Sequence, residues 1–193
     1  MSQKPRILAF AGSARKGSYN KKLVKIAAAG AEKNGAVVTY VDLRDLPMPI
    51  YDADLETAEG LPANAVEFKR LLATHDGFLI ASPENNGTIS ALLKNVIDWA
   101  SRRLEGEPAY AGFEGRVAAI MAASPGALGG IRGLTQLRVL LENMKVMVLP
   151  DQRALSEAHK AFLEDGSLVD SKTQAAVESI GAKLADTVSR LKR

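Results

Sequence analysis

The chain has 193 residues, of which 47% are hydrophobic and 24% are charged, a composition typical of a soluble globular protein with a sizeable core. It has no cysteine, which excludes disulfides, thiolate nucleophiles, iron–sulfur clusters and cysteine-based zinc sites. The formal net charge is only +3 and the basic residues are scattered, so we expect no nucleic-acid partner.

No apolar run approaches the roughly 20 residues of a membrane span, and no signal-peptide pattern is present. We therefore expect one cytoplasmic domain over residues 1–193, without a membrane partner.

Hydrophobic runs and capping signals predict strands and helices in alternation. In chain order they are a strand at 7–11, a helix at 18–34, a strand at 36–41, a helix at 63–74, a strand at 77–81, a helix at 90–103, a strand at 117–122, a helix at 134–144, a strand at 146–149 and a helix at 172–191. Ser171 and Gln174 predict a capping box at the start of the last helix. Because each strand is a short continuous apolar run, the pattern predicts a doubly wound α/β fold with a parallel sheet.

Ligands of such sheets bind beyond the carboxyl ends of the strands. In this sequence, three predicted loops lie there, at residues 12–20, 82–88 and 124–133. We therefore look for function in these loops.

The loop after the first strand has the composition of an anion site. Gly12 to Asn20 opens a helix, so free backbone N–H groups and the positive end of the helix dipole converge there. Ser13, Ser18 and Asn20 add short donors, and Arg15 offers a bidentate cation for a phosphate. The alternative is an ordinary polar turn in which Ser18 merely caps the helix.

The glycines of this loop fit neither familiar nucleotide motif. Gly12 and Gly17 have the spacing of a Walker A loop, but Ser18 stands where that motif requires lysine. A dinucleotide fingerprint needs a third glycine, which the loop lacks. The loop is therefore predicted to hold the terminal phosphate of a monoester.

The second loop is predicted to hold a flat ring with its main chain. It contains Pro83, Glu84, Asn85, Asn86 and Gly87. Pro and Gly predict a tight loop whose backbone N–H groups approach a heterocycle closely, and Asn tolerates unusual backbone angles. At a flavin, such donors would face the ring edge where negative charge grows on reduction. The alternative is a simple turn.

The third loop begins with Ser124, Pro125 and Gly126 and is rich in glycine, so its backbone is able to approach a ligand. Arg132 is a candidate for the phosphate of a second nucleotide, and the alternative is a solvated or interface residue. In the preceding helix, the charge pattern around Asp98 indicates a solvated face more than a catalytic acid. Trp99 is expected in the core or at a subunit interface.

Acid–base machinery is scarce in the three loops. The two histidines, His75 and His159, lie outside them, and neither a G-x-S-x-G elbow nor a metal-binding histidine cluster is present. A chain with ligand-holding loops and few acid–base groups favours a cofactor that brings its own reactivity. We expect no bound metal.

In their order and spacing, the motifs of the three loops resemble the NADPH-dependent FMN reductase family. They are Gly12-Ser13-x-Arg15-x-x-Ser18-x-Asn20, Ser82-Pro83-Glu84-x-Asn86-Gly87 running into Leu93-Lys94-Asn95-x-Ile97-Asp98-Trp99, and Ser124-Pro125-Gly126-x-x-Gly129-Gly130. The resemblance covers nearly the whole chain. It implies a flavodoxin-like three-layer sandwich whose five-stranded parallel sheet has the order 2-1-3-4-5.

The resemblance also implies non-covalent FMN, NADPH or NADH as the electron donor, a small-molecule electron acceptor and a homodimer or homotetramer. By position, Ser13, Arg15, Ser18 and Asn20 would hold the FMN phosphate. Pro83, Glu84, Asn85, Asn86 and Gly87 would line the isoalloxazine ring, with Ser124, Pro125 and Gly126 near its other side. Many relatives carry Tyr at the position of Asn85, so the acceptor stays open. A flavodoxin-type electron carrier and an FMN-free nucleotide-binding module are the alternatives.

Overall fold

The computed structural model describes residues 3–192 and is built around one parallel sheet. In spatial order the strands are β2 (Val37–Asp42), β1 (Arg6–Ala11), β3 (Gly77–Ala81), β6 (Val117–Ala123) and β7 (Met147–Val148). Adjacent strands pair in parallel throughout this order. The order matches the expected 2-1-3-4-5, which confirms the doubly wound, flavodoxin-like class.

The fifth strand position is split, which corrects the single strand predicted at 146–149. β7 pairs with the start of β6, and β8 (Arg153–Leu155) pairs with the end of β6 further along the same edge. Pro150 stands between the two pieces. Because proline has no N–H to give to the ladder, the pairing stops there and resumes three residues later.

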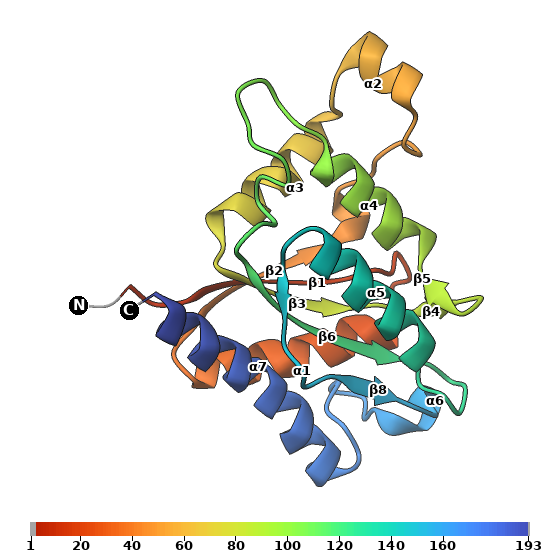
Figure 1. The fold of residues 1–193 in the computed structure, drawn as a ribbon. Helices are drawn as coiled ribbons and strands as arrows, with labels where there is room; N and C mark the ends of the chain where they lie inside the picture. Colours follow the sequence, from red (N-terminus) through yellow and green to blue (C-terminus); the bar gives the residue numbers. More distant parts are fainter. Residues whose placement is uncertain (1–2, 193) are drawn as a thin grey trace.

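Helices cover both faces of the sheet (Figure 1). One face carries α1 (Tyr19–Lys33) and α7 (Ser171–Leu191); the other carries α3 (Ala63–Thr74), α4 (Ala91–Ser101) and α5 (Ile131–Asn143). The alternation of side chains along β1 explains this division, because Ile7 and Ala9 pack with α1 and α7 while Leu8 and Phe10 pack with α3, α4 and α5. The sheet is therefore buried on both sides.

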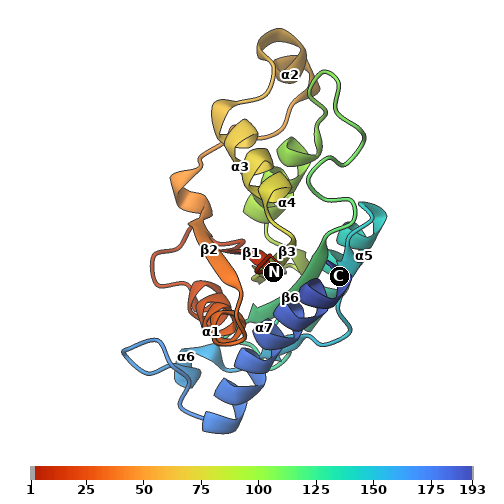
Figure 2. The same cartoon turned by 90° about the vertical axis from the view of Figure 1, so that its left-hand side faces the viewer.

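Helices α1 and α7 lie side by side in closer contact than ordinary side chains allow (Figure 2). A Cβ added at Gly181 would lie 1.8 Å from the carbonyl oxygen of Ala27, and one at Gly30 would lie 2.0 Å from that of Glu178. The two glycines therefore permit this packing, which fixes α1 and the loop before it against the sheet.

Several short elements lie outside the prediction. They are the 3₁₀ turn at Leu43–Asp45, α2 (Ala53–Glu59), the hairpin strands β4 (Glu84–Asn85) and β5 (Thr88–Ile89), and α6 (Ala158–Ala161). Helix α2 buries none of its residues and projects beyond α3 and α4 (Figure 2), so it has no apolar stripe to predict it.

Two predicted helix starts need correction. α5 begins at Ile131, three residues before the predicted Leu134. The last helix is capped by Asp170, whose carboxylate accepts from the backbone N–H groups of Lys172 and Thr173, so the predicted Ser171–Gln174 capping box does not form. Within residues 3–192, no helix combines the length and the apolar character that crossing a membrane requires.

Candidate functional site

The three predicted loops meet at the carboxyl edge of the sheet, where direct contacts hold them together. The Ser90 hydroxyl donates to the Gly12 carbonyl over 2.6 Å and also caps α4, accepting from Leu93 N–H. A Cβ at Gly12 would lie 2.8 Å from that of Leu93, so only glycine lets the first loop approach α4 this closely.

Nine of the twelve predicted site residues line one hollow of about 190 Å³ between the loops. These nine are Ser13, Arg15, Ser18, Asn20, Pro83, Glu84, Asn85, Ser124 and Pro125. Tyr19 and Ala123 complete the lining. Asn86 and Gly87 form the turn of the neighbouring hairpin, and Gly126 lies in the third loop. The structure thus brings the predicted loops together, while their ligand contacts stay predictions.

The donor set on the α1 side of this hollow fits a phosphate. The Ser18 side chain caps α1 by accepting from Lys21 N–H, as the alternative reading expected, yet its hydroxyl hydrogen remains available to a ligand. Arg15 is exposed, with its guanidinium 5.4 Å from the centroid of the Tyr19 ring. The first turn of α1 carries no acidic residue. The positive end of the α1 dipole, the Ser18 hydroxyl and the Arg15 guanidinium would therefore all favour a bound anion.

Asn20 has a structural contact that the sequence did not predict. Its side-chain amide donates to the carbonyl of Ala123 and accepts from the N–H of Ala123, both over 2.9 Å, and the residue is buried. These two bonds tie the start of α1 to the end of β6. The second N–H of the amide is not used by them, so a contact to a phosphate stays compatible with this clamp.

The second loop forms a short β-hairpin, so both the ring-binding loop and the simple turn that was its alternative stay open. Asn85 pairs with Thr88, and the two turn residues Asn86 and Gly87 have φ angles of 52° and 83°. Both angles lie in the left-handed region, which makes this an Asn-Gly turn of the kind that closes two-residue hairpins. Asn85, the exposed residue just before the turn, lines the hollow of about 190 Å³.

Glu84 directs its carboxylate toward α5. The carboxylate accepts from the backbone N–H groups of Arg132 and Gly133 over 3.0 and 3.2 Å, and from Nε of Arg132 over 2.7 Å. Burial alone would raise the pKa of Glu84, but these donors hold it below its ordinary value. Glu84 is therefore no candidate for a proton donor, and Arg132, proposed for a second phosphate, is engaged with Glu84 instead.

The third loop rests on β8. Ser124 N–H donates to the carbonyl of Leu155 over 3.0 Å, and the Ser124 hydroxyl accepts from Gly126 N–H over 3.2 Å. A Cβ at Gly129 would lie 2.8 Å from the backbone of Leu155 and Ser156. The residues after Pro150, where the sequence predicts no strand or helix before residue 172, thus support the site.

Asp98 and Trp99 lie outside this hollow. Asp98 pairs with Lys94 over 2.7 Å on the helix surface, which agrees with the solvated-face interpretation. Trp99 is fully buried and donates its indole N–H to the carbonyl of Pro49 over 2.8 Å. Trp99 is therefore a core residue, which was one of the two places expected for it, the other being a subunit interface.

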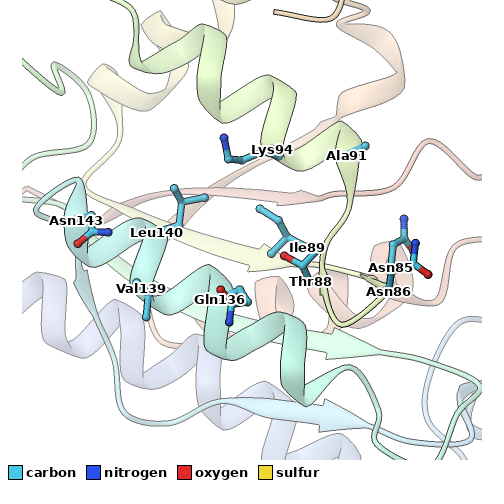
Figure 3. Close-up of a pocket in the computed structure, with 10 residues that line it drawn as sticks. All are labelled: Asn85, Asn86, Thr88, Ile89, Ala91, Lys94, Gln136, Val139, Leu140 and Asn143. Carbon is cyan, nitrogen blue, oxygen red and sulfur yellow. The ribbon is translucent and has the colours of Figure 1, made fainter.

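A larger hollow of about 600 Å³ lies between α4 and α5, with the hairpin at one end (Figure 3). Its lining comprises Asn85, Asn86, Thr88, Ile89, Ala91, Lys94, Gln136, Val139, Leu140 and Asn143. Sequence analysis missed it, although Val139, 51% exposed, interrupts the polar face of α5. Because Asn85 lines both hollows, the larger one opens beside the predicted phosphate site.

Known proteins resemble the chain in both sequence and structure. A family model for NADPH-dependent FMN reductase matches residues 5–160. An NAD(P)H-dependent FMN reductase of Pseudomonas aeruginosa is 33% identical over 193 residues, 100% of both chains. A quinone reductase of Escherichia coli K12 is 34% identical over 179 residues, 90% of this chain and 89% of the relative. The flavoenzyme NAD(P)H:(acceptor) oxidoreductase of Paracoccus denitrificans has a TM-score of 0.80 at 26% identity, covering 96% of this chain and 98% of the other.

The family match includes all three loops and the helices that follow them. The relatives quoted are similar over almost their whole length, so the likeness is not confined to one motif. The chain belongs to the NADPH-dependent FMN reductase family, oxidoreductases that work with FMN and NAD(P)H.

Proposed function

We propose that the chain passes electrons from NAD(P)H through FMN to a small oxidised acceptor by a ping-pong route. A quinone is the first candidate acceptor, and azo compounds, chromate and ferric complexes are the others. The observation that carries the proposal is the hollow at the start of α1, lined by Ser13, Arg15 and Ser18, which lies beside a glycine-containing hairpin in a chain of this family. The quinone assignment draws support from the Escherichia coli relative, which is named a quinone reductase.

In this proposal the hollow of about 190 Å³ takes the phosphate end of FMN. Arg15 would supply the cation, and Ser13 and Ser18 would donate hydroxyl hydrogen bonds. The first N–H groups of α1 have no partners within the helix and would complete the set. The site thereby compensates a phosphate charge without any metal ion.

The hairpin and the third loop would hold the flavin ring. Backbone N–H groups near Asn85 and Gly87 would donate to its polar edge, and the segment from Ser124 to Gly126 would face its other side. FMN, when bound, supplies electron-transfer chemistry that no side chain of this chain offers. Neither histidine lines the hollow and Glu84 is saturated with donors, so the protein works by positioning and hydrogen bonding.

We further propose that the hollow of about 600 Å³ is covered by a second copy of the chain, giving a homodimer or a homotetramer of two dimers. The lining is mixed, with apolar side chains that include Val139 and Leu140, and Val139 is half exposed, so a partner that covers the hollow would bury apolar surface. Lys94 and Asp98 lie close together on α4. A two-fold axis would let the Lys94 of each copy face the Asp98 of the other, as a self-complementary interface requires.

Steady-state kinetics with NADPH and a benzoquinone test the proposed reaction. The ping-pong route predicts parallel lines when reciprocal rate is plotted against reciprocal NADPH concentration at several quinone concentrations. Converging lines would contradict it. A flavodoxin-type carrier would bind FMN but show no NADPH-dependent turnover, and an FMN-free module would bind no flavin.

A further inference from the structure

Helix α5 begins without a cap of its own. Its N-cap residue Gly130 has a φ of 96° and no side chain to offer. The cap comes instead from Glu84 in the hairpin, 48 residues earlier, whose Oε2 accepts from the N–H groups of Arg132 and Gly133. One carboxylate thus satisfies donors that would otherwise be left free at the helix start.

The Arg132 side chain completes this contact. Its Nε donates to Oε1 of Glu84 over 2.7 Å, and a terminal guanidinium nitrogen contacts the same oxygen. The Glu84 side chain is only 6% exposed, whereas that of Arg132 is 61% exposed. A carboxylate buried to this extent is stable only while its donors stay in place, so the hairpin has one preferred position on the helix.

The hairpin and the first turn of α5 are also in close contact, with glycine where they meet. A Cβ at Gly133 would lie 3.2 Å from the carbonyl oxygen of Thr88 and 3.4 Å from Cβ of Glu84. A Cβ at Gly130 would lie 2.7 Å from that of Ala122. The first turn of α5 therefore touches both strands of the hairpin and the end of β6, which is the surface between the second and third loops.

We propose that Glu84 is a positioning residue for the flavin ring, because its carboxylate fastens the hairpin to α5 and so presents the hairpin and the third loop as one rigid unit. The inference rests on the proposed function, in which these two loops hold the ring. The phosphate loop does not depend on this carboxylate, since Ser90 and Asn20 attach it to α4 and β6. Loss of the Glu84 carboxylate should therefore weaken the binding of the flavin ring and leave the contacts to the phosphate unchanged.

The experiment compares Glu84→Ala with Glu84→Gln and with a matched control, Glu107→Ala. Glu107 also accepts from a backbone N–H, that of Leu104 over 2.9 Å, and from a buried cation, Lys69 over 2.8 Å. It lies in the loop between α4 and β6, and Figure 1 shows this loop at the upper left, away from the hairpin strands β4 and β5 at the right. The control therefore removes the same chemistry away from the site.

Two measurements are made on each protein. Amide hydrogen exchange in the flavin-free protein reports the contact itself, without relying on the proposed function. Fluorescence titration gives dissociation constants for FMN and for riboflavin, which carries the ring without the phosphate.

In Glu84→Ala, we expect exchange to accelerate together at Arg132, Gly133 and the hairpin amides of Asn85 and Thr88. The dissociation constants for FMN and riboflavin should both rise, by about tenfold. Glu84→Gln keeps an acceptor oxygen and should recover most of both effects. Glu107→Ala should leave the exchange of these amides unchanged and both dissociation constants within about twofold of wild type.

If the wild type binds both flavins and Glu84→Ala binds them with the same dissociation constants, the positioning role is wrong and the proposed function stands. A wild type that binds neither flavin would overturn the proposed function. Should Glu84→Ala not fold, Arg132→Ala keeps the backbone cap and should raise the same exchange rates and both dissociation constants to a smaller extent. Unchanged values in Arg132→Ala would then contradict the inference.

Discussion

At the scale of single residues, the site separates side chains that hold the loops from side chains left to bind. The hydroxyl of Ser90 donates to the backbone of Gly12, and the side-chain amide of Asn20 bonds to the backbone of Ala123 and keeps one N–H for a ligand. Arg15, in contrast, is exposed and lines the hollow of about 190 Å³. An exposed guanidinium in a loop contributes little to folding, so we propose that Arg15 binds the ligand.

The substitution Arg15→Ala should therefore weaken FMN binding and spare the fold. Hydrogen bonds to a charged group contribute about 1.5–3 kcal/mol, which corresponds to a rise in the FMN dissociation constant of roughly tenfold to a hundredfold. Riboflavin affinity should stay the same because riboflavin has no phosphate. Lys16→Ala, which removes the neighbouring exposed cation, is the control. An equal loss for FMN and riboflavin would refute the phosphate assignment.

The hairpin tip bears on the choice of acceptor. Asn85 is exposed and lies where the two hollows meet. Asn85→Tyr should change the kcat/KM for quinones relative to chromate severalfold, because an aromatic ring there adds an apolar face. The rate of flavin reduction by NADPH, measured by stopped flow, should change less than twofold. Asn85→Ala is the control, because it removes the amide without adding an aromatic ring. Equal changes in flavin reduction by NADPH and in flavin oxidation by the acceptor would contradict a role of Asn85 on the acceptor side.

At the scale of elements, buried polar residues tie helices to the sheet. His75, directly after α3, is buried, with Nδ1 2.6 Å from the carbonyl of Leu71 and Nε2 2.9 Å from the hydroxyl of Thr39 on β2. A carbonyl only accepts, so Nδ1 carries the hydrogen and Nε2 accepts from Thr39. The neutral ring thus has both nitrogens paired.

Burial lowers the pKa of His75 below its ordinary value of 6.5. The unfolded state then binds more protons than the folded state once the pH falls below about 6.5, so stability should decrease from that pH downward. His75→Gln has no group titrating in this window and should show a weaker pH dependence. Urea unfolding at about pH 7.5 and about pH 5.5 measures this difference. An identical pH dependence in the two proteins would contradict it.

The elements that sequence predicts best are those that bury a continuous apolar pattern. β1, β3 and β6 were located within one residue because each is an uninterrupted apolar run. The β4–β5 hairpin was seen only as a turn because its strands have two residues each. The predicted strand at 146–149 ends before Pro150, and β8 beyond it was missed because its three residues form no apolar run.

The candidate site was predictable in its loops but not in its internal contacts. Glycine and proline positions and helix-start signals point to the three loops directly from sequence. The clamp from Asn20 to Ala123 and the cap from Glu84 to Arg132 join residues 103 and 48 positions apart. No local pattern encodes such pairs, so sequence reasoning missed both contacts, and the ligand roles expected for Asn20 and Glu84 stay predictions.

At the scale of the whole molecule, the sheet order gathers the three loops at one edge and leaves the face between α4 and α5 hollow. The hollow of about 600 Å³ begins at the hairpin, so a second copy of the chain that covers it would also lie next to the proposed flavin ring. Oligomer formation and catalysis are coupled in this account.

Val139→Lys should therefore lower the molar mass in solution from a multiple of 20.6 kDa to that of one chain. A lysine at position 139 would carry an unpaired charge into the interface, unlike Lys94, which is paired with Asp98, at a cost of several kcal/mol. Val37→Lys is the control, because Val37 on the edge strand β2 is 50% exposed, almost equal to the 51% of Val139. Light scattering measures both masses. A monomeric wild type, or a Val139→Lys protein with the wild-type mass, would contradict the proposed interface.

Adding NADPH to the FMN-loaded protein without oxygen tests the central claim most directly. The account predicts that the visible flavin absorption disappears within the time of one catalytic turnover and returns when a quinone is added. Flavin that stays oxidised in the presence of excess NADPH, or protein that takes up no FMN, would contradict it.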